Sequence, residues 1–229
     1  MALALTEDAV AIRDLVRDFA KREVAPAAAG WDAADALPDA PVRALGDLGV
    51  LSLALAEDAG GAGLGPMELA LVCEELGAAS AVLGHYVATL AGRLAVFAAV
   101  APVHPDLAAA AGGTLRLAAE AAPPLARGTD GRLAGRVDPM RLATTAERAL
   151  FTLSGGERLV LVDATAPGVT REGRGGPLGL RGADLGALRL AGVAAEELGA
   201  LPAGAGVRAV ALTRIGLAAV AVGIGRAAV

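Results

Sequence analysis

The sequence contains few aromatic residues and a single cysteine. Only 2% of its 229 residues are aromatic although 55% are hydrophobic, so alanine, valine and leucine must form the core. Each of these small side chains removes less area from water than an aromatic ring does. Cys73 alone excludes a disulfide framework, which predicts an intracellular, cytoplasmic protein. With no activating neighbour in the sequence, Cys73 is expected on the apolar face of a helix and not in catalysis.

The sequence also lacks the signatures of several functional classes. The net charge of −5 gives no footprint for nucleic acid, and 19 arginines beside the single Lys21 indicate a compositional bias. His85 and His104 have no cysteine or acid at ligand spacing, so no metal site is expected. Glu7 and Asp8 stand where a secretory signal would need positive charge. No Walker-type loop, nucleophile elbow or dinucleotide fingerprint occurs in the sequence.

Two hydrophobic runs, residues 82–101 and 207–229, approach the length of a membrane span. The first contains His85 and Arg93, and the second contains three arginines. A central arginine costs roughly 2.5 to 3.5 kcal/mol on membrane insertion, and alanine-rich helices offset little of that cost. We therefore expect both runs to be helices buried within a protein, with no membrane partner.

The first half of the sequence has the pattern of helices. Thr6 can cap a first helix, which Pro26 is expected to end. Trp31 then falls in a polar connection that ends at Pro38. Periodic apolar positions predict further helices at residues 42–48, 67–76 and 82–100.

From Gly112 onward the pattern changes to short strands separated by glycine, proline and aspartate. Candidate strands lie at residues 114–118, 132–137, 149–153, 158–162, 168–171 and 187–193. Six short strands predict a small antiparallel barrel or sandwich. The chain returns to helix from Gly206 to Val229 and stops there without a closing glycine. We therefore expect either a chain that is cut short or a last helix that leans on a partner.

The predicted fold class is α+β. We expect an N-terminal all-α domain at residues 1–111 and a small antiparallel β domain at residues 112–203. The start of a truncated C-terminal helical domain follows at residues 204–229. The apolar pattern of each part supports these limits.

Four segments of the sequence together resemble one known family. They are VRDFAKREVAP at 16–26, the glycine loop and helix that end in EELG at 74–77, VDATAPGV at 162–169 with LGLRGAD at 178–184, and TRIGLAA at 213–219. These segments span nearly the whole chain and are similar to the acyl-CoA dehydrogenase family. The resemblance implies a final four-helix bundle, of which this sequence has the first helix. It also implies a flavoprotein of fatty acid metabolism that uses FAD to dehydrogenate an acyl-CoA thioester.

The resemblance places the flavin on two segments that differ from the family pattern. Family members have a Thr-Glu-Pro-Gly-x-Gly-Ser turn where this sequence has residues 119–125, AEAAPPL. By resemblance Ala119 and Glu120 would contact the cofactor, and only Glu120 matches the pattern. On the second segment Met140 and Arg141 occupy places where the family has an aliphatic residue and threonine. The flavin motif is therefore degraded.

No catalytic residue is assigned. In most of the family the carboxylate base lies in the final bundle, and in a minority it is a glutamate just before an arginine of the returning helix. The second position is Thr213 here. Glu196 and Glu197 precede that helix, and we expect them to be solvated.

The resemblance also suggests three substrate residues, Gly61, Gly63 and Arg214. The glycines can instead simply permit a tight turn, and the turn is the safer interpretation. Arg214 can equally form a partly buried ion pair with an acid of the first domain. Arg181 and Asp184 are expected to form a structural pair at a corner of the β domain.

Three functions remain open. The chain can be an FAD-dependent acyl-CoA dehydrogenase that is divergent or incomplete. It can be a non-catalytic partner subunit, a pseudoenzyme in an oligomer with a full-length homologue. It can also be a module that binds an acyl thioester without redox chemistry. We expect an oligomer in either of the first two cases, with dehydrogenation belonging to the assembly.

Overall fold

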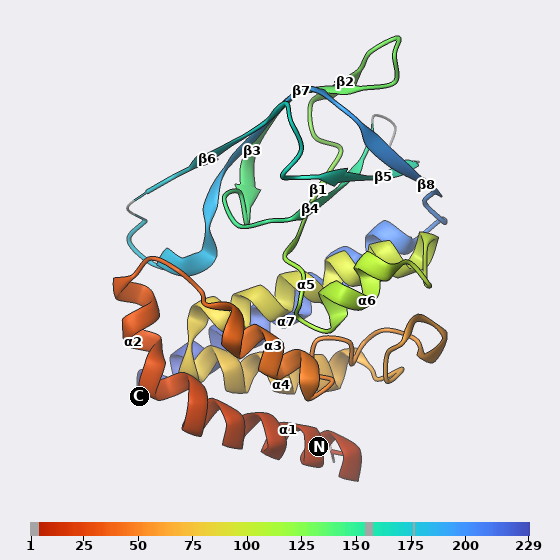
Figure 1. The fold of residues 1–229 in the computed structure, drawn as a ribbon. Helices are drawn as coiled ribbons and strands as arrows, with labels where there is room; N and C mark the ends of the chain where they lie inside the picture. Colours follow the sequence, from red (N-terminus) through yellow and green to blue (C-terminus); the bar gives the residue numbers. More distant parts are fainter. Residues whose placement is uncertain (1–4, 154–157, 176) are drawn as a thin grey trace.

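The computed structural model describes residues 5–153, 158–175 and 177–229. A layer of helices supports two β-sheets, and the last helix returns beneath the sheets to the helical layer (Figure 1). The fold thus has the predicted order of helices, strands and one final helix.

The helical layer is built from six α-helices in chain order. They are α1 (Glu7–Phe19), α2 (Ala25–Ala33), α3 (Asp39–Asp47), α4 (Pro66–Ala79), α5 (Ala81–Val100) and α6 (Pro105–Ala111). The Thr6 hydroxyl accepts a hydrogen bond from the Ala9 amide at 3.1 Å, which confirms the expected cap of α1. The face of α4 that carries Cys73 is buried, as its apolar spacing predicts.

Proline lies in the first turn of two helices, α2 and α6. Pro26 was predicted to end the first helix, but the chain continues through a π-helical turn at Ala20–Val24 into α2. Pro26 lies in the first turn of α2, where no amide hydrogen bond is needed. Trp31 consequently lies within α2 and not in a connection. Pro105 begins α6 in the same way, a helix that the sequence analysis missed.

Within residues 5–153, 158–175 and 177–229, eight strands form two four-stranded sheets. The strands are β1 (Leu117–Ala121), β2 (Leu125–Arg127), β3 (Leu133–Arg141), β4 (Arg148–Thr152), β5 (Arg158–Asp163), β6 (Val169–Gly173), β7 (Leu185–Val193) and β8 (Ala195–Ala200). One sheet has the order β1-β4-β5-β8, and the other has the order β2-β3-β7-β6. All pairings are antiparallel except that of β1 with β4, which is parallel.

The sheets correct the prediction in three respects. The first strand begins at Leu117, so residues 114–116 precede it. The strands β2 and β8 were not predicted, because β2 has three residues and β8 carries two glutamates in place of apolar alternation. The parallel pairing of β1 with β4 also departs from the expected all-antiparallel arrangement.

The final helix, α7 (Ala205–Ala227), packs closely against α4 and α5. A Cβ atom added at Gly223 would lie 2.1 Å from the Glu74 carbonyl oxygen, and one at Gly77 would lie 2.7 Å from that of Val220. A Cβ atom at Gly92 would lie 2.8 Å from the carbonyl oxygen of Ala209. Glycine at these positions therefore allows the helix backbones to approach each other.

The other face of α7 is exposed and carries large hydrophobic residues together with Arg208 and Arg214. Its exposed large hydrophobic residues are Val207, Val210, Ile215, Val222 and Ile224. Judged by length and composition alone, α5 and α7 are each long and apolar enough to cross a membrane. In the part of the chain described here, 72% of the apolar window of α5 is buried within the protein, against 33% of that of α7.

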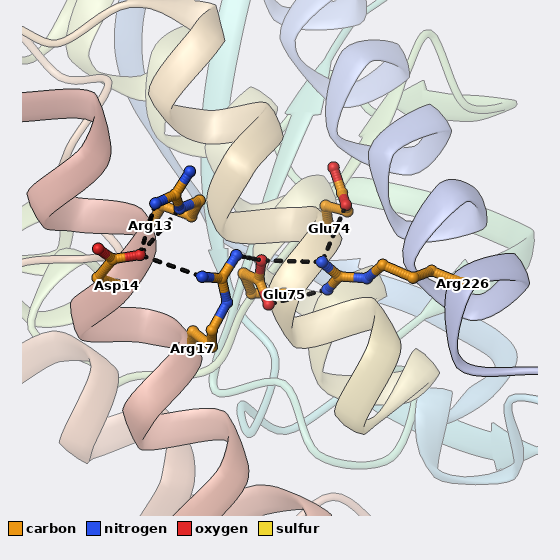
Figure 2. A network of polar contacts seen from close by, with 6 residues as sticks. All are labelled: Arg13, Asp14, Arg17, Glu74, Glu75 and Arg226. Carbon is orange, nitrogen blue, oxygen red and sulfur yellow. Dashed lines mark hydrogen bonds and ion pairs between the residues drawn. The ribbon is translucent and has the colours of Figure 1, made fainter. Parts of the chain in front are cut away.

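A buried carboxylate joins three helices of this layer (Figure 2). Glu75 of α4 accepts from the Arg17 guanidinium of α1 at 2.7 Å and from the Arg226 guanidinium of α7 at 2.8 Å. Burial acts to raise the pKa of Glu75, but the hydrogen bonds from Arg226 and Arg17 outweigh it and hold that pKa below its usual value. Glu75 therefore connects the beginning and the end of the chain.

Replacing Gly223 by alanine should destabilise the fold, because the added methyl group must push α7 away from the backbone of α4. We expect a loss of about 1 to 3 kcal/mol in the free energy of unfolding, measured by urea denaturation. Gly225→Ala is the matched control on the same helix, since nothing lies within 4 Å of its Cβ position. That control should gain up to about 1 kcal/mol of helix propensity. Equal effects of the two changes would contradict the close contact.

Replacing Glu75 by glutamine should cost about 2 kcal/mol of unfolding free energy at pH 7, since two charge-assisted hydrogen bonds lose their ionised acceptor. The folded pKa lies below the unfolded one, so the contribution is present above the unfolded pKa and disappears as the pH falls through the folded pKa. The difference between the two proteins should therefore shrink in acid.

The matched control for this change is Glu74→Gln. Glu74 is more exposed than Glu75, and its one ion pair joins it to Arg226 at 3.3 Å. Its replacement should change the free energy of unfolding by less than about 1 kcal/mol. A pH-independent loss in Glu75→Gln would show that the charge of Glu75 is not what holds the helices.

Candidate functional site

The two segments that resemble flavin contacts both reach the upper side of α5. Ala119 and Glu120 lie in β1, which α5 holds through a 2.9 Å hydrogen bond from Arg93 Nη1 to the carbonyl oxygen of Leu117. Met140 and Arg141 end β3, and Arg141 lines a cavity together with residues of α5. The fold thus brings these separate segments close to Arg93 of α5.

The cavity between α5 and the end of β3 is very small, with a volume of about 10 Å³. Its polar lining consists of His85, Tyr86, Thr89, Arg93 and Arg141. None of the residues that line it in the described chain is a carboxylate. The cavity can hold an object of about the size of one water molecule.

Two polar side chains of this cavity, Tyr86 and Arg93, are buried, and among the described residues neither has a partner of opposite charge. Arg93 is only 7% exposed, and among the described residues it has no ion pair. Burial, and secondarily the nearby charge of Arg141, lowers the pKa of Arg93 to about 10, so the guanidinium is charged at neutral pH. Burial and the same positive neighbours lower the pKa of His85 to about 4, which leaves its imidazole neutral.

Tyr86 and Arg116 complete the surroundings. The Arg116 guanidinium lies 5.0 Å from the centre of the Tyr86 ring and is held by Asp39 at 2.8 Å. The Tyr86 hydroxyl is buried, and within the described part of the structure it has no hydrogen-bond partner. Burial raises the pKa of Tyr86, so this hydroxyl keeps its proton.

The turn after β1 has few backbone donors left for an isoalloxazine ring. The Ala121 amide donates to the Glu120 side chain at 3.3 Å, and the Ala122 amide donates to the Thr152 hydroxyl at 2.8 Å. Pro123 and Pro124 have no amide hydrogen, and the next amide, at Leu125, donates to the carbonyl oxygen of Pro123 at 2.7 Å.

The second segment offers no flavin surface either. The side chain of Met140 is 1% exposed and belongs to the core, while Arg141 is exposed at the wall of the small cavity. A stacking ring and a hydroxyl, which the family pattern has here, are both missing. The residues present at 119–125 and 139–141 therefore do not fit the isoalloxazine of FAD.

The acids near the returning helix have structural partners. Glu196 and Glu197 lie in β8, which precedes α7, and both are exposed, as expected. Glu197 forms ion pairs with Arg127 and Arg158, and Glu196 lies 3.3 Å from a ring nitrogen of His104. Neither acid lines the small cavity.

The glycine loop has the geometry of a turn. Gly60 and Gly63 have φ values of 78° and 65°, which favour glycine, and a Cβ atom at Gly61 would lie 2.2 Å from the carbonyl oxygen of Leu55. The turn interpretation is therefore confirmed. Gly61 and Gly63 do not line the cavity beside Arg93 or the larger cavity beside Arg116, so their contact with a substrate stays a prediction.

Among the described residues, Arg214 and Arg181 do not form the ion pairs that were considered for them. Arg214 is exposed on α7, and the described residues give it no ion pair; the arginine of α7 that pairs with an acid of the first domain is Arg226. Asp184 does not pair with Arg181, since it accepts hydrogen bonds from the backbone and hydroxyl groups of Thr144 and Thr145. Its role is to cap that turn.

Other candidate sites have fewer groups that are free to bind or react. A second cavity of about 300 Å³ is lined in part by Asp39, Arg116 and Glu147, whose charges are engaged with one another and with backbone groups. Cys73 is buried as expected, and burial raises the pKa of its thiol to about 12, so the thiol is not a nucleophile at neutral pH. Among the residues that the structure describes, no group of three potential metal ligands occurs.

The cluster of His85, Tyr86 and Arg93 was not predicted from the sequence. Its signal is present in the sequence, since polar residues at 85, 89 and 93 follow one face of an otherwise apolar helix. From the sequence, Arg93 indicated only that residues 82–101 do not span a membrane. The sequence could not show that Arg141 lies beside it.

Comparisons with known proteins agree with this architecture. The model of the acyl-CoA dehydrogenase N-terminal domain matches residues 6–129. Over 84 residues, or 37% of this chain, the sequence is 34% identical to a probable acyl-CoA dehydrogenase, YngJ, of Bacillus subtilis, and this stretch is 22% of that protein. Over 76 residues, or 33% of the chain, it is 43% identical to (2S)-methylsuccinyl-CoA dehydrogenase of Cereibacter sphaeroides, which is 14% of that protein.

Solved structures match almost the full chain but not their own full length. Glutaryl-CoA dehydrogenase from Mycobacterium smegmatis aligns with a TM-score of 0.81 and 26% identity over 96% of this chain and 63% of that one. Butyryl-CoA dehydrogenase from Megasphaera elsdenii aligns with a TM-score of 0.82 and 21% identity over 100% of this chain and 68% of that one. Since the family model covers more than half of the sequence and the fold agrees throughout, the chain belongs to the acyl-CoA dehydrogenase family.

Proposed function

We propose that this chain is an acyl-CoA dehydrogenase-like protein that is catalytically incomplete by itself. In this proposal, α,β-dehydrogenation of an acyl-CoA thioester belongs to an assembly with a full-length, flavin-bearing homologue. The chain supplies the helical layer and the sheets of one subunit to that assembly.

The observation that carries the proposal is the state of the turn after β1. Its remaining amides at Ala121, Ala122 and Leu125 are engaged within the chain, and the two prolines between them have none. One related structure, glutaryl-CoA dehydrogenase from Mycobacterium smegmatis, is described in complex with FADH2. At 23% identity that structure supports the shared fold, whereas the flavin contacts must be judged from the residues of this chain.

The exposed hydrophobic residues of α7 support the second part of the proposal. Soluble proteins rarely leave a row of large aliphatic side chains uncovered along a whole helix. In α7 such residues include Val207 and Val222, which are 76% and 59% exposed. A helical surface of another subunit would remove them from water.

The purified protein should be colourless and should not retain FAD, since the turn has no donors to offer the ring. The measurement is the visible absorbance near 450 nm after incubation with excess FAD and gel filtration. Glutaryl-CoA dehydrogenase from Mycobacterium smegmatis, prepared in the same way, is the positive control. A yellow protein with one FAD per chain would refute the proposal.

Co-expression with a full-length homologue of this family should give a complex that co-purifies through two steps. Val222→Glu should reduce the recovered complex at least tenfold, because a charge in an apolar interface costs roughly 1.4 kcal/mol or more. Val103→Glu is the matched control, since Val103 is 88% exposed and lies outside α7. Loss of complex in both variants, or in neither, would argue against the α7 face as the contact.

A further inference from the structure

Arg93 is a buried charge that the fold leaves uncompensated. Its side chain is 7% exposed, and the hydrogen bond that it makes to the described residues goes to a neutral carbonyl, that of Leu117. Buried arginines are ordinarily paired, because an unpaired charge in a poorly solvated site costs several kcal/mol. In the described chain no carboxylate lies within ion-pair distance of Arg93. A negative charge beside Arg93 would offset that cost.

A second unpartnered group lies beside the same cavity. Tyr86 is 3% exposed, and its hydroxyl finds no hydrogen-bond partner in the described residues. The Thr89 hydroxyl, which also lines the cavity, donates to the carbonyl oxygen of His85 at 2.9 Å and is therefore engaged. Among the described residues, the buried donors at the cavity that remain are the Tyr86 hydroxyl and the guanidinium of Arg93, with the imidazole of His85 and the exposed guanidinium of Arg141 beside them.

The charges around the cavity are predominantly positive. Arg141 lines its wall, and Arg116 lies over the ring of Tyr86 but is neutralised by Asp39. His85 is neutral at pH 7. Glu120 is the acid whose charge reaches Arg93, yet its carboxylate is beyond ion-pair distance and accepts from the Ala121 amide. The field in the cavity therefore favours an anion.

The volume limits the size of that anion. About 10 Å³ corresponds to a single water-sized object, so a nucleotide, a phosphate ester or a flavin ring is too large. A halide ion or one oxygen of a carboxylate matches this volume. Both are monovalent acceptors, which suits two donors and one uncompensated positive charge.

We propose that this cavity binds a compact monovalent anion, a halide or the carboxylate end of a small organic acid, between the guanidinium of Arg93 and the hydroxyl of Tyr86. The site is independent of the proposed function, because it needs neither flavin nor a second subunit. Its failure would leave the absorbance experiment unaffected, and a yellow protein would leave the anion experiment unaffected.

Thermal unfolding of the purified chain in different sodium salts at constant ionic strength tests the proposal. Chloride, bromide and acetate are the probes, and gluconate, which is too large for the cavity, balances the ionic strength. We expect a saturable rise in Tm of roughly 5 °C when the anion reaches about a hundred times its Kd. A rise with halides alone identifies a halide site, and a rise with acetate identifies a carboxylate site; both support the proposal.

Variants connect the effect to the cavity. Arg93→Met should abolish the anion-dependent rise while the protein stays folded, because the change removes an unpaired buried charge. Tyr86→Phe removes one oxygen atom and should weaken anion binding about tenfold, the equivalent of one lost hydrogen bond. Arg214→Met is the matched control, since Arg214 is exposed on α7 and does not line the cavity, and it should keep the full rise.

The outcomes that overturn the proposal are equally clear. A Tm that is the same in gluconate and in the three probe salts would show that no anion binds. An unchanged anion-dependent rise in both Arg93→Met and Tyr86→Phe would show that the anion binds elsewhere. Where halides raise the Tm, a crystal soaked in bromide should show an anomalous peak beside Arg93, and a peak confined to the protein surface would then refute the site.

Discussion

The close contact of α7 with α4 and α5 is the constraint on which the rest of the structure depends. Glycines at the contact let the backbones approach, so that the burial comes from tightly packed small groups instead of aromatic rings. Glu75 then ties α4 to both α1 and α7 through two guanidinium groups (Figure 2). A chain with 2% aromatic residues can form a core in this way, because close packing compensates for the small area of each side chain.

This helical layer also determines what the surface beneath the sheets can bind. Because α5 lies directly under β1 and β3, its polar residues meet the two segments that resemble flavin contacts. In this chain the meeting point is filled by arginine, histidine and tyrosine side chains, and only a water-sized space remains. The chain therefore keeps the fold of the family, while the residues at this point between α5 and β3 are mostly positively charged or polar.

Much of the fold could be predicted from local patterns. The spacing of apolar residues gave α4 and α5 within a few residues, and the six predicted strands all exist. The prediction failed where local sequence and tertiary contact disagree. Pro26 was predicted to end a helix but lies in the first turn of α2. The strand β8 contains Glu196 and Glu197 and nevertheless pairs with β5. The strand β5 supplies the backbone hydrogen bonds of β8, and the side-chain pattern of β8 did not predict them.

The sequence by itself determined the family, the order of the elements and the difference of residues 119–125 from the family's flavin motif, because these follow from motifs and residue types that are adjacent along the chain. The tertiary structure alone decided which charges meet. Arg226 rather than Arg214 pairs with the first domain, Asp184 caps a turn instead of pairing with Arg181, and Arg93 lies near Arg141 without a counter-ion. Electrostatic interactions act through space over a few ångströms, so they depend on positions that no local pattern encodes.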